Sequence, residues 1–407
     1  MSEFSIASYF PWCRMKVAYQ SVLPEAKGAL VRLEPDQRFR PLCHECGGAA
    51  RTVHSHTRRF VRDLAFGQCP MMLQIEHRKV WCDTCGGVRV EKLDFVDASQ
   101  RVTYRLGAYA AELCRLGLPV SVVAEHLDLD PKTVKAFDQA ALQASCGETN
   151  YRGLERLAID EIAIKKGHHY MTVVLDYDRG RVVWLGAGRR TETLDVFFQN
   201  MPENVRLGIR AVAVDMWEPF IQAVQRWCPQ ADVVFDLFHV VKAFNTVIDD
   251  IRNEEFRKAA EPQRQVLKGS KYLFLKNWRG LTRGQRFRLD DILHLNRRLN
   301  TVYWLKDALK WVWSYRSVAW ARRALDEWYA VALEDGHRAL RRFVDMLRRH
   351  EYGILNHCKH LIHTSRLEGV NNKIKVIKRV AFGFHDLDYF ALKVKQAFPG
   401  RMLRYRA

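Results

Sequence analysis

The stretch Leu157-Ala-Ile-Asp-Glu-Ile-Ala-Ile164 is apolar and rich in β-branched residues, but two acids, Asp160 and Glu161, interrupt it. An apolar run of this length predicts a buried strand, where a carboxylate is costly unless a cation offsets its charge. A metal ion is such a cation. Because neighbouring side chains on a strand point to opposite faces, only one of these acids is expected to line a site, and we favour Asp160.

Two further acids stand in comparable positions. Ile209-Arg-Ala-Val-Ala-Val-Asp215 is a strand-like run that ends in an acid, and Ser365-Arg-Leu-Glu368 opens a helical pattern. Three carboxylates on two strands and a helix can hold two divalent ions, which prefer oxygen ligands and activate phosphoryl transfer. Each acid also has a purely structural explanation, because Asp160 can pair with a cation, Asp215 can cap a helix and Glu368 can complete a capping box.

The pattern around these acids predicts an antiparallel meander followed by alternating helices and strands. The predicted elements are strands at 156–164, 169–177 and 181–188, a helix at 191–200, a strand at 209–215, a helix at 218–227 and a strand at 232–235. We interpret this order as a ribonuclease H-like sheet with Asp160 and Asp215 on neighbouring strands. Asp236 and His239 follow the last strand, either as accessory site residues or as a helix cap and a packed histidine.

No strand pattern occurs from about residue 245 to 355, which we predict to be an all-helical insertion between the second and third acids. This segment is rich in tryptophan: Trp304, Trp311, Trp313, Trp320 and Trp328. Aromatic rings among Arg and Lys can stack on bases, but at helical spacing we expect most of them to pack in a core.

Two cysteine pairs precede this region, Cys43-His-Glu-Cys46-Gly-Gly and Cys82-Asp-Thr-Cys85-Gly-Gly. Each pair can supply one edge of a tetrahedral Zn²⁺ site, and we predict one structural zinc ion held by all four thiolates. The rival ligands are His44, His54, His56 and His77. The long separation of the pairs predicts a small sheet between them, with an alternating strand at 72–81. Arg58, Arg59 and Arg62 in that sheet are either phosphate contacts or an ordinary solvated charge run.

A helical trio follows the cysteines. We predict helices from Tyr104 to Leu116, from Val120 to Leu127 and from Pro131 to about Ala144. The last two read as a helix-turn-helix, in which Lys132, Thr133 and Lys135 would face the major groove of DNA. A plain helical linker domain is the alternative.

Charge points to a polyanionic partner. The 407 residues carry a formal net charge of +19. The net charge is +2 over residues 1–150, −2 over 151–250, +12 over 251–350 and +7 over 351–407. An excess of Lys and Arg concentrated after the two strand acids favours DNA as the partner. No apolar run reaches the length of a membrane span and no signal pattern opens the chain, so we expect a cytoplasmic protein that associates with the nucleoid when it acts.

Taken together, these motifs resemble a transposase of the ISL-three family of bacterial insertion sequences. The resemblance extends over about 43–385 and rests on the order of the cysteine knuckle, the helix-turn-helix, Ala158-Ile-Asp160-Glu, Ala213-Val-Asp215-Met, Asp236-Leu-Phe-His239 and Ser365-Arg-Leu-Glu368-Gly-Val-Asn-Asn-Lys. It departs from the family pattern in having His44 where proline is common.

The resemblance implies a catalytic DDE triad of Asp160, Asp215 and Glu368 that binds two Mg²⁺ or Mn²⁺ ions. The protein would cut double-stranded DNA at the terminal inverted repeats of its element and transfer the ends to target DNA. After Glu368, a group of polar and basic side chains would contact DNA: Asn371, Asn372, Lys375, Lys378 and Arg379. Because two element ends must meet, we expect at least a dimer on DNA.

The α/β multidomain organisation predicted on these grounds has six parts: an N-terminal arm (1–40), a zinc-binding domain (41–98), a helix-turn-helix domain (99–150), the first part of the catalytic domain (151–244), the helical insertion (245–355) and the last part with its C-terminal tail (356–407). Two other functions remain open. One is a transposase-derived DNA-binding regulator without catalysis, and the other is a two-metal DNA nuclease or resolvase that cuts without joining.

Overall fold

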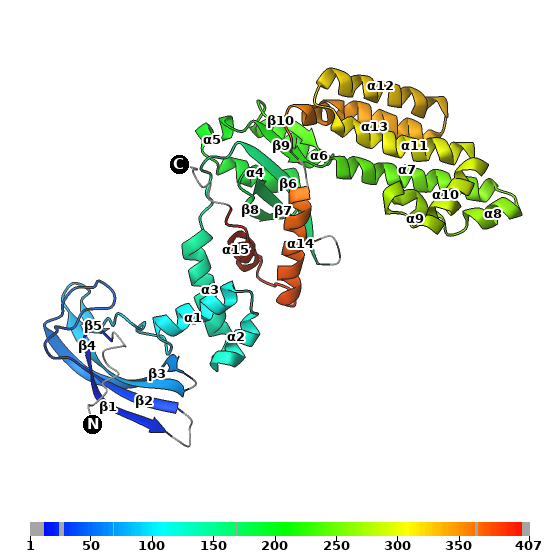
Figure 1. Ribbon diagram of the computed structural model, residues 1–407. Coiled ribbons are helices and arrows are strands. Elements are labelled where there is room, and N and C mark those ends of the chain that lie inside the picture. Colours follow the sequence, from blue (N-terminus) through cyan, green and yellow to red (C-terminus); the bar gives the residue numbers. More distant parts are fainter. Residues whose placement is uncertain are drawn as a thin grey trace, which may run out of the picture. The chain divides into compact units, whose positions relative to one another are not determined.

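The computed structural model describes residues 12–23, 28–67, 69–165, 167, 169–362 and 365–400. The chain forms two compact units, each with its own sheet (Figure 1). The first unit comprises Met1–Gly147 and Arg379–Gly383, and the second comprises Glu148–Lys378 and Phe384–Ala407. Across the described residues, we find no helix with the length and apolar character needed to cross a bilayer.

The first unit begins with a five-stranded sheet. Its strands are β1 (Met15–Leu23), β2 (Gly28–Pro35), β3 (Thr52–Phe66), β4 (Cys69–Cys82) and β5 (Gly87–Val90). The order is β1-β2-β4-β3, with β5 paired to β4, and only the β2–β4 pair is parallel. The strand expected at 72–81 is therefore confirmed. The expectation of an irregular arm over 1–40 is wrong for its described part, because 15–23 and 28–35 form an antiparallel pair of strands, and β2 pairs with β4 and buries alternate side chains.

Three helices complete this unit: α1 (Tyr104–Arg115), α2 (Val120–Leu127) and α3 (Pro131–Cys146). The side chain of Asp130 accepts hydrogen bonds from the amides of Lys132 and Thr133 and so begins α3. Asp128 ends α2 in the left-handed region, at φ 50°. This αL residue turns the chain between the two helices within three residues, as the predicted helix-turn-helix requires.

A buried carboxylate joins the sheet to these helices. Asp63 on β3 is 1% exposed. It accepts hydrogen bonds from Trp12 Nε1 at 3.3 Å and Thr103 Oγ1 at 2.7 Å, and it forms an ion pair with Arg105. Since Thr103 also caps α1, the same contacts fix the first helix to the sheet.

The second unit is built on the sheet β10-β9-β6-β7-β8. Its strands are β6 (Arg156–Lys165), β7 (His169–Asp176), β8 (Arg181–Ala187), β9 (Ala211–Val214) and β10 (Asp232–Phe235). β6, β7 and β8 are antiparallel neighbours, whereas β9 and β10 run parallel to β6. The helices between them are α4 (Thr191–Gln199), α5 (Glu203–Leu207) and α6 (Glu218–Trp227). The predicted meander and alternation are thus confirmed, and α5 is an addition.

A long helical segment leaves the sheet directly after β10. Its elements are α7 (Leu237–Lys258), α8 (Glu261–Leu267), α9 (Lys271–Leu275), η2 (Trp278–Gly280), α10 (Arg283–Leu295), α11 (Arg297–Trp311), η3 (Val312–Ser314), α12 (Val318–Glu334), α13 (Arg338–Leu355) and η4 (Asn356–Cys358). The segment is helical as expected, but its helices begin at Leu237 rather than near residue 245. The chain then continues through α14 (Ser365–Val380) and α15 (Leu387–Ala397).

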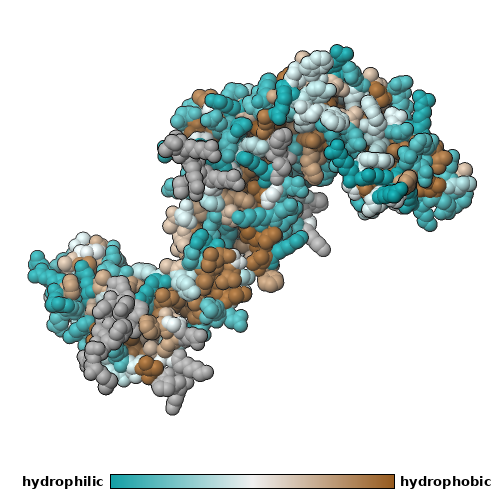
Figure 2. Space-filling view, viewed as in Figure 1, coloured by the Kyte–Doolittle hydropathy of each residue, from teal (hydrophilic) through white to brown (hydrophobic). Residues whose placement is uncertain are grey.

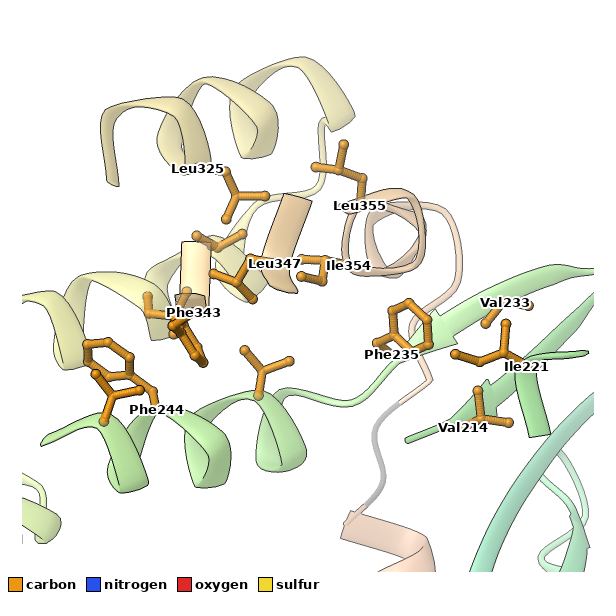
Figure 3. Packing of buried hydrophobic residues seen from close by; sticks show 14 of the residues in the cluster. Val214, Ile221, Val233, Phe235, Phe244, Leu325, Phe343, Leu347, Ile354 and Leu355 are labelled. Carbon is orange, nitrogen blue, oxygen red and sulfur yellow. The ribbon is translucent and has the colours of Figure 1, made fainter. Parts of the chain in front are cut away.

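The end of α13 packs the insertion against the sheet of the second unit. Figure 3 shows Phe235, at the end of β10, beside Ile354 of α13. A Cβ built on Gly353 would lie 2.4 Å from the Phe235 ring, so the glycine allows the helix to approach the strand closely. Asn356 Nδ2 also donates to Val233 O at 3.0 Å. The insertion therefore shares one hydrophobic core with the sheet.

The tryptophans of the insertion divide into two groups. Trp328 is buried and Trp313 is partly buried, as expected. The prediction of core packing is wrong for the three that remain more than half exposed: Trp304, Trp311 and Trp320. In the view of Figure 2, the insertion has a mostly hydrophilic surface with scattered hydrophobic side chains.

Candidate active site and cysteine cluster

Strand register places three acids at one edge of the second sheet. Ala158 of β6 pairs with Ala213 of β9, so Asp160 and Asp215, each two residues further along, stand at equivalent levels. Phe235 of β10 pairs with Val214 of β9, and Asp236 follows it directly. Because the three strands are parallel, Asp160 within β6, Asp215 directly after β9 and Asp236 directly after β10 lie on adjacent strands.

The site disfavours negative charge. Burial raises the pKa of Asp160, and the nearby charge of Asp236 adds to this effect. Burial, with the charges of Glu161 and Asp160, raises the pKa of Asp215 to about 6. The imidazole of His239 acts in the opposite direction on both carboxyl groups. The residues that could be accessory, Asp236 and His239, thus belong to the same electrostatic cluster as the two predicted acids.

Glu161 is closer to this cluster than strand alternation alone suggests. Its carboxylate forms an ion pair with Arg189 at 3.1 Å, while its charge still raises the pKa of Asp215. Glu161 therefore acts electrostatically on Asp215, and the expectation that only one of Asp160 and Glu161 lines the site stays a prediction.

Helix α14 reaches the acids through an asparagine. Asn371 Nδ2 donates to Asp160 Oδ2 at 2.6 Å, and Lys378 Nζ donates to the carbonyls of Ala163 and Ile164 at 3.1 and 3.2 Å. Two residues predicted to contact DNA thus fasten α14 to β6. Glu368 lies one turn before Asn371, on the same side of the helix. The side chain of Ser365 is outside the described residues, so the capping box that it would form with Glu368 remains a prediction.

Glu368, the third predicted acid, does not form a metal-binding group with the two strand acids in this structure. Glu368 is exposed, and apart from the four cysteines no group of three or more Cys, His, Asp or Glu within the described ranges has its ligand atoms within 4.8 Å of one another. The donor set nevertheless suits a divalent cation. Among the described residues, the buried oxygens Asp236 Oδ2 and Glu161 Oε2 have no hydrogen-bond partner. Unpaired carboxylate oxygens in a cluster of like charges are ligands for Mg²⁺ or Mn²⁺.

The four cysteines Cys43, Cys46, Cys82 and Cys85 converge in the first unit, with all Sγ atoms within 4.8 Å of one another. Sγ of Cys43 lies 3.9 Å from Sγ of Cys85, and Sγ of Cys46 lies 3.5 Å from Sγ of Cys82. A tetrahedral ion with Zn–S bonds of about 2.3 Å requires sulfurs about 3.8 Å apart, so the cluster is compatible with a zinc knuckle.

Backbone amides support the sulfurs. The amide of Gly48 donates to Cys46 Sγ at 3.4 Å, and the amide of Cys85 donates to Cys82 Sγ at 3.5 Å. The second of these bonds is the largest of the causes that lower the pKa of Cys82 to about 7, and hydrogen bonds with the other cysteine side chains add to it. A donor directed at sulfur favours the thiolate, which is the form that binds metal.

The three arginines of β3 have different surroundings. Arg59 donates to the carbonyls of Asp97, Ala98 and Gln100 at 2.7 to 3.0 Å, and burial lowers its pKa. Its guanidinium therefore holds a loop rather than facing solvent. Arg62 pairs with Asp128 at 3.5 Å, at the turn of the helix-turn-helix. Arg58 is more than half exposed but pairs with Glu76.

The remaining predicted DNA contacts occupy open positions. Lys132 is exposed at the first turn of α3, next to the partly exposed Thr133 and Lys135. On α14, the side chains of Asn372, Lys375 and Arg379 are exposed. None of these positions is excluded by burial, so their role remains a prediction.

Sequence reasoning missed two features of the site. The first is the hydrogen bond of Asn371, which its spacing of three residues from Glu368 could have indicated. The second is Arg189, whose contacts come from β6, from β7 and from the loop after β9. No local pattern distinguishes it from the adjacent Arg190.

Comparison with known proteins agrees with this arrangement. Residues 157–394 match the family model described as transposase, and residues 91–140 match the helix-turn-helix domain of transposase family ISL3. The chain is 42% identical to the transposase for insertion sequence element IS1001 of Bordetella parapertussis, over 88% of this chain and 89% of the relative. It is 28% identical to the transposase for insertion sequence element IS1557 of Mycobacterium tuberculosis, over 87% of this chain and 85% of the relative. The chain therefore belongs to the ISL3 family of transposases.

Proposed function

We propose that this protein binds the terminal inverted repeats of an insertion sequence and catalyses divalent-metal-dependent cleavage and strand transfer of double-stranded DNA. The observation that carries the proposal is the shared level of Asp160 and Asp215 on adjacent parallel strands, with Asn371 of α14 hydrogen-bonded to Asp160. Together with the order of strands in the second sheet, this arrangement supports a ribonuclease H-like catalytic domain with a DDE triad completed by Glu368.

Within this proposal, Asp160, Asp215 and Glu368 would hold two Mg²⁺ or Mn²⁺ ions. The ions would supply Lewis-acid activation of the attacking and leaving oxygens. Asn371 would orient the Asp160 carboxylate by its hydrogen bond. Movement of Glu368 towards the two strand acids would complete the ligand set when metal and DNA bind, because apo sites are commonly looser than loaded ones.

The first unit would recognise the element ends. The four cysteines would hold one structural zinc ion and so order the loops that carry Cys43–Cys46 and Cys82–Cys85. Lys132, Thr133 and Lys135 would enter the major groove from the start of α3, and Arg58 would contact phosphate. The net charge of +12 over 251–350 supports contacts between the Lys and Arg side chains of the insertion and the DNA phosphates. Two ends must be paired, so the active form would be at least a dimer.

A cleavage assay tests the proposal. Purified protein is incubated with labelled linear DNA carrying the element's own ends, in Mg²⁺ or in EDTA, beside a Glu368→Ala variant. We expect cleavage at the ends and a strand-transfer product, both requiring Mg²⁺ and Glu368. Tight end binding without cleavage in any metal would instead indicate a regulator, and cleavage without joined products would indicate a nuclease.

A further inference from the structure

We propose that a pocket beside Asp215 binds one unpaired nucleobase of the DNA end that is being cut. Its walls include Tyr170 of β7, Arg189 and Arg190 after β8, Thr193 of α4 and Trp217 after β9. The inference rests on the proposed function, since it assigns a ligand to a pocket at the same catalytic site.

Two aromatic rings in this pocket are positioned by one arginine. The Arg189 guanidinium carbon lies 4.3 Å from the centroid of the Tyr170 ring and 4.8 Å from that of Trp217. Trp217 Nε1 donates to the carbonyl of Arg189 at 3.1 Å. The indole is therefore held from two directions while 37% of Trp217 stays exposed. A ring held in place before binding loses little conformational entropy when a ligand stacks on it.

The chemistry of the pocket favours a base over a phosphate. The charge of Arg189 is already offset by Glu161, with which it pairs at 3.1 Å. The only hydrogen-bond donor of the Trp217 indole is used by the Arg189 carbonyl. What Trp217 can offer a ligand is thus ring surface, and every nucleobase presents a complementary π face. Arg190, exposed in the pocket wall, can meet the phosphate of the same nucleotide.

The pocket is directly joined to the catalytic acids. The amide of Trp217 donates to Asp215 Oδ1 at 3.2 Å, and Glu161 is the neighbour of Asp160 in sequence. A nucleotide whose base enters the pocket would therefore have its phosphate near Asp215. Bases inside a duplex are covered by their neighbours, so the base must be unstacked and unpaired to enter. Capturing it would fix the position of the strand relative to the acids.

Abasic substitution of the DNA tests this inference. Affinity for the element end is measured without added Mg²⁺ or Mn²⁺, which prevents cleavage but leaves the zinc ion in place, with single abasic sites placed in turn at the positions flanking the cut on each strand. In the wild-type protein, removing one particular base should weaken binding about tenfold, the size typical of a lost stacking contact. Trp217→Ala should weaken binding to intact DNA by a similar factor and should abolish the penalty at that position. Trp217→Phe should retain it.

A matched tryptophan controls for general effects. Trp278 is 39% exposed and belongs to the helical insertion. In Trp278→Ala, the loss of affinity caused by the abasic site should be as large as in the wild-type protein, whatever the change in affinity for intact DNA. The inference is overturned if Trp217→Ala retains the full penalty, or if no position produces one in the wild-type protein.

A second arm separates this inference from the proposed function. Binding of a single-stranded oligonucleotide to the wild-type protein and to Trp217→Ala requires neither element ends nor cleavage. About tenfold weaker binding by the variant, without metal-dependent cleavage by the wild-type protein, would support the pocket and refute the transposase reaction. If the wild-type protein cleaves DNA but Trp217→Ala changes binding to neither kind of DNA, the transposase reaction is supported and the pocket is refuted.

Discussion

Asn371 on α14 donates a hydrogen bond to Asp160 on β6 at 2.6 Å, across 211 positions of sequence. This contact connects the helix that follows the insertion with the strand that precedes it. It also lowers the pKa of Asp160, against the opposing effect of burial. The helical segment between β10 and α14 therefore does not separate Asp160 from the helix that bears Glu368.

Asn371→Ala should slow metal-dependent cleavage by about tenfold to a hundredfold, the usual effect of removing a group that orients a metal ligand. Without the hydrogen bond, the pKa of Asp160 should rise, so the pH profile of cleavage should move to higher pH. Single-turnover cleavage of a labelled element end measures both effects. Asn300→Ala, at an exposed asparagine of α11, is the matched control. An unchanged pH profile in Asn371→Ala would show that the contact does not act through Asp160.

The sequence predicted the sheet accurately because local pattern and tertiary environment agree there. Each strand of the second unit is a short apolar run bounded by turn residues, and the observed bounds differ from the predicted ones by at most two residues. The alignment of Asp160 with Asp215 could be anticipated because each acid directly follows a short apolar run, Leu157-Ala-Ile159 before Asp160 and Ala211-Val-Ala-Val214 before Asp215. The position of Asp236 beside Asp215 then follows from the parallel register of β9 and β10.

Other features depend on contacts that no local pattern encodes. Exposure of Trp304, Trp311 and Trp320 was not predicted, because helical spacing places a side chain on a face but does not say whether another element covers that face. The strands at 15–23 and 28–35 were missed because their apolar residues alternate weakly and because they are held by pairing, β1 with β2 and β2 with β4. The sequence left open whether Arg59 contacts phosphate or is a solvated charge, and neither alternative anticipates its hydrogen bonds to three loop carbonyls.

Asp215 predicts how the stability of the metal-free protein depends on pH. Its pKa rises from 3.8 to about 6 in the fold. Between these pH values the folded protein keeps a proton that the unfolded chain has released, so the contribution of Asp215 to the free energy of unfolding falls as pH rises through this window. Above about pH 6 the folded protein carries the full cost of the charge. Asp215→Asn should therefore raise the Tm in EDTA at pH 7.5 and leave it nearly unchanged at pH 4.

Thermal denaturation at the two pH values measures this difference. Asp290→Asn, at an exposed carboxylate of α10, should leave the Tm unchanged at both. An equal rise in the Tm of Asp215→Asn at pH 4 and pH 7.5 would mean that the effect is not one of ionisation. Mg²⁺ should raise the Tm of the wild-type protein at pH 7.5, because a bound cation offsets the repulsion among the carboxylates, and this gain should be smaller in Asp215→Asn.

The cysteine cluster predicts one zinc ion per chain. Four sulfurs within 4.8 Å of one another repel as thiolates unless a cation lies between them. Elemental analysis should find zinc at a ratio of about one per chain, and Cys46→Ser should lose most of it. Cys13→Ser, at an exposed cysteine outside the cluster, should retain the metal. Loss of zinc should lower the affinity for element ends, and full end binding by zinc-free protein would contradict the proposed role of the cluster.

Close packing at the end of α13 predicts opposite effects for two glycine substitutions. Gly353→Ala would place a Cβ 2.4 Å from the ring of Phe235, and both residues lie in the joint core of the sheet and the insertion. Relieving this overlap requires the helix or the ring to shift, so we expect a loss of about 1–3 kcal/mol in the free energy of unfolding.

Gly284→Ala is the matched control, because nothing lies within 4 Å of the Cβ that it would add in the first turn of α10. There the methyl group restricts the unfolded chain without a clash, and we expect stabilisation of about 0.4–1 kcal/mol. Urea denaturation measures both variants. If Gly353→Ala is as stable as Gly284→Ala, then α13 does not approach β10 as closely as Phe235 indicates. If instead it is destabilised and also cleaves DNA more slowly, the packing of the insertion helps to position Asp236, the residue that follows Phe235.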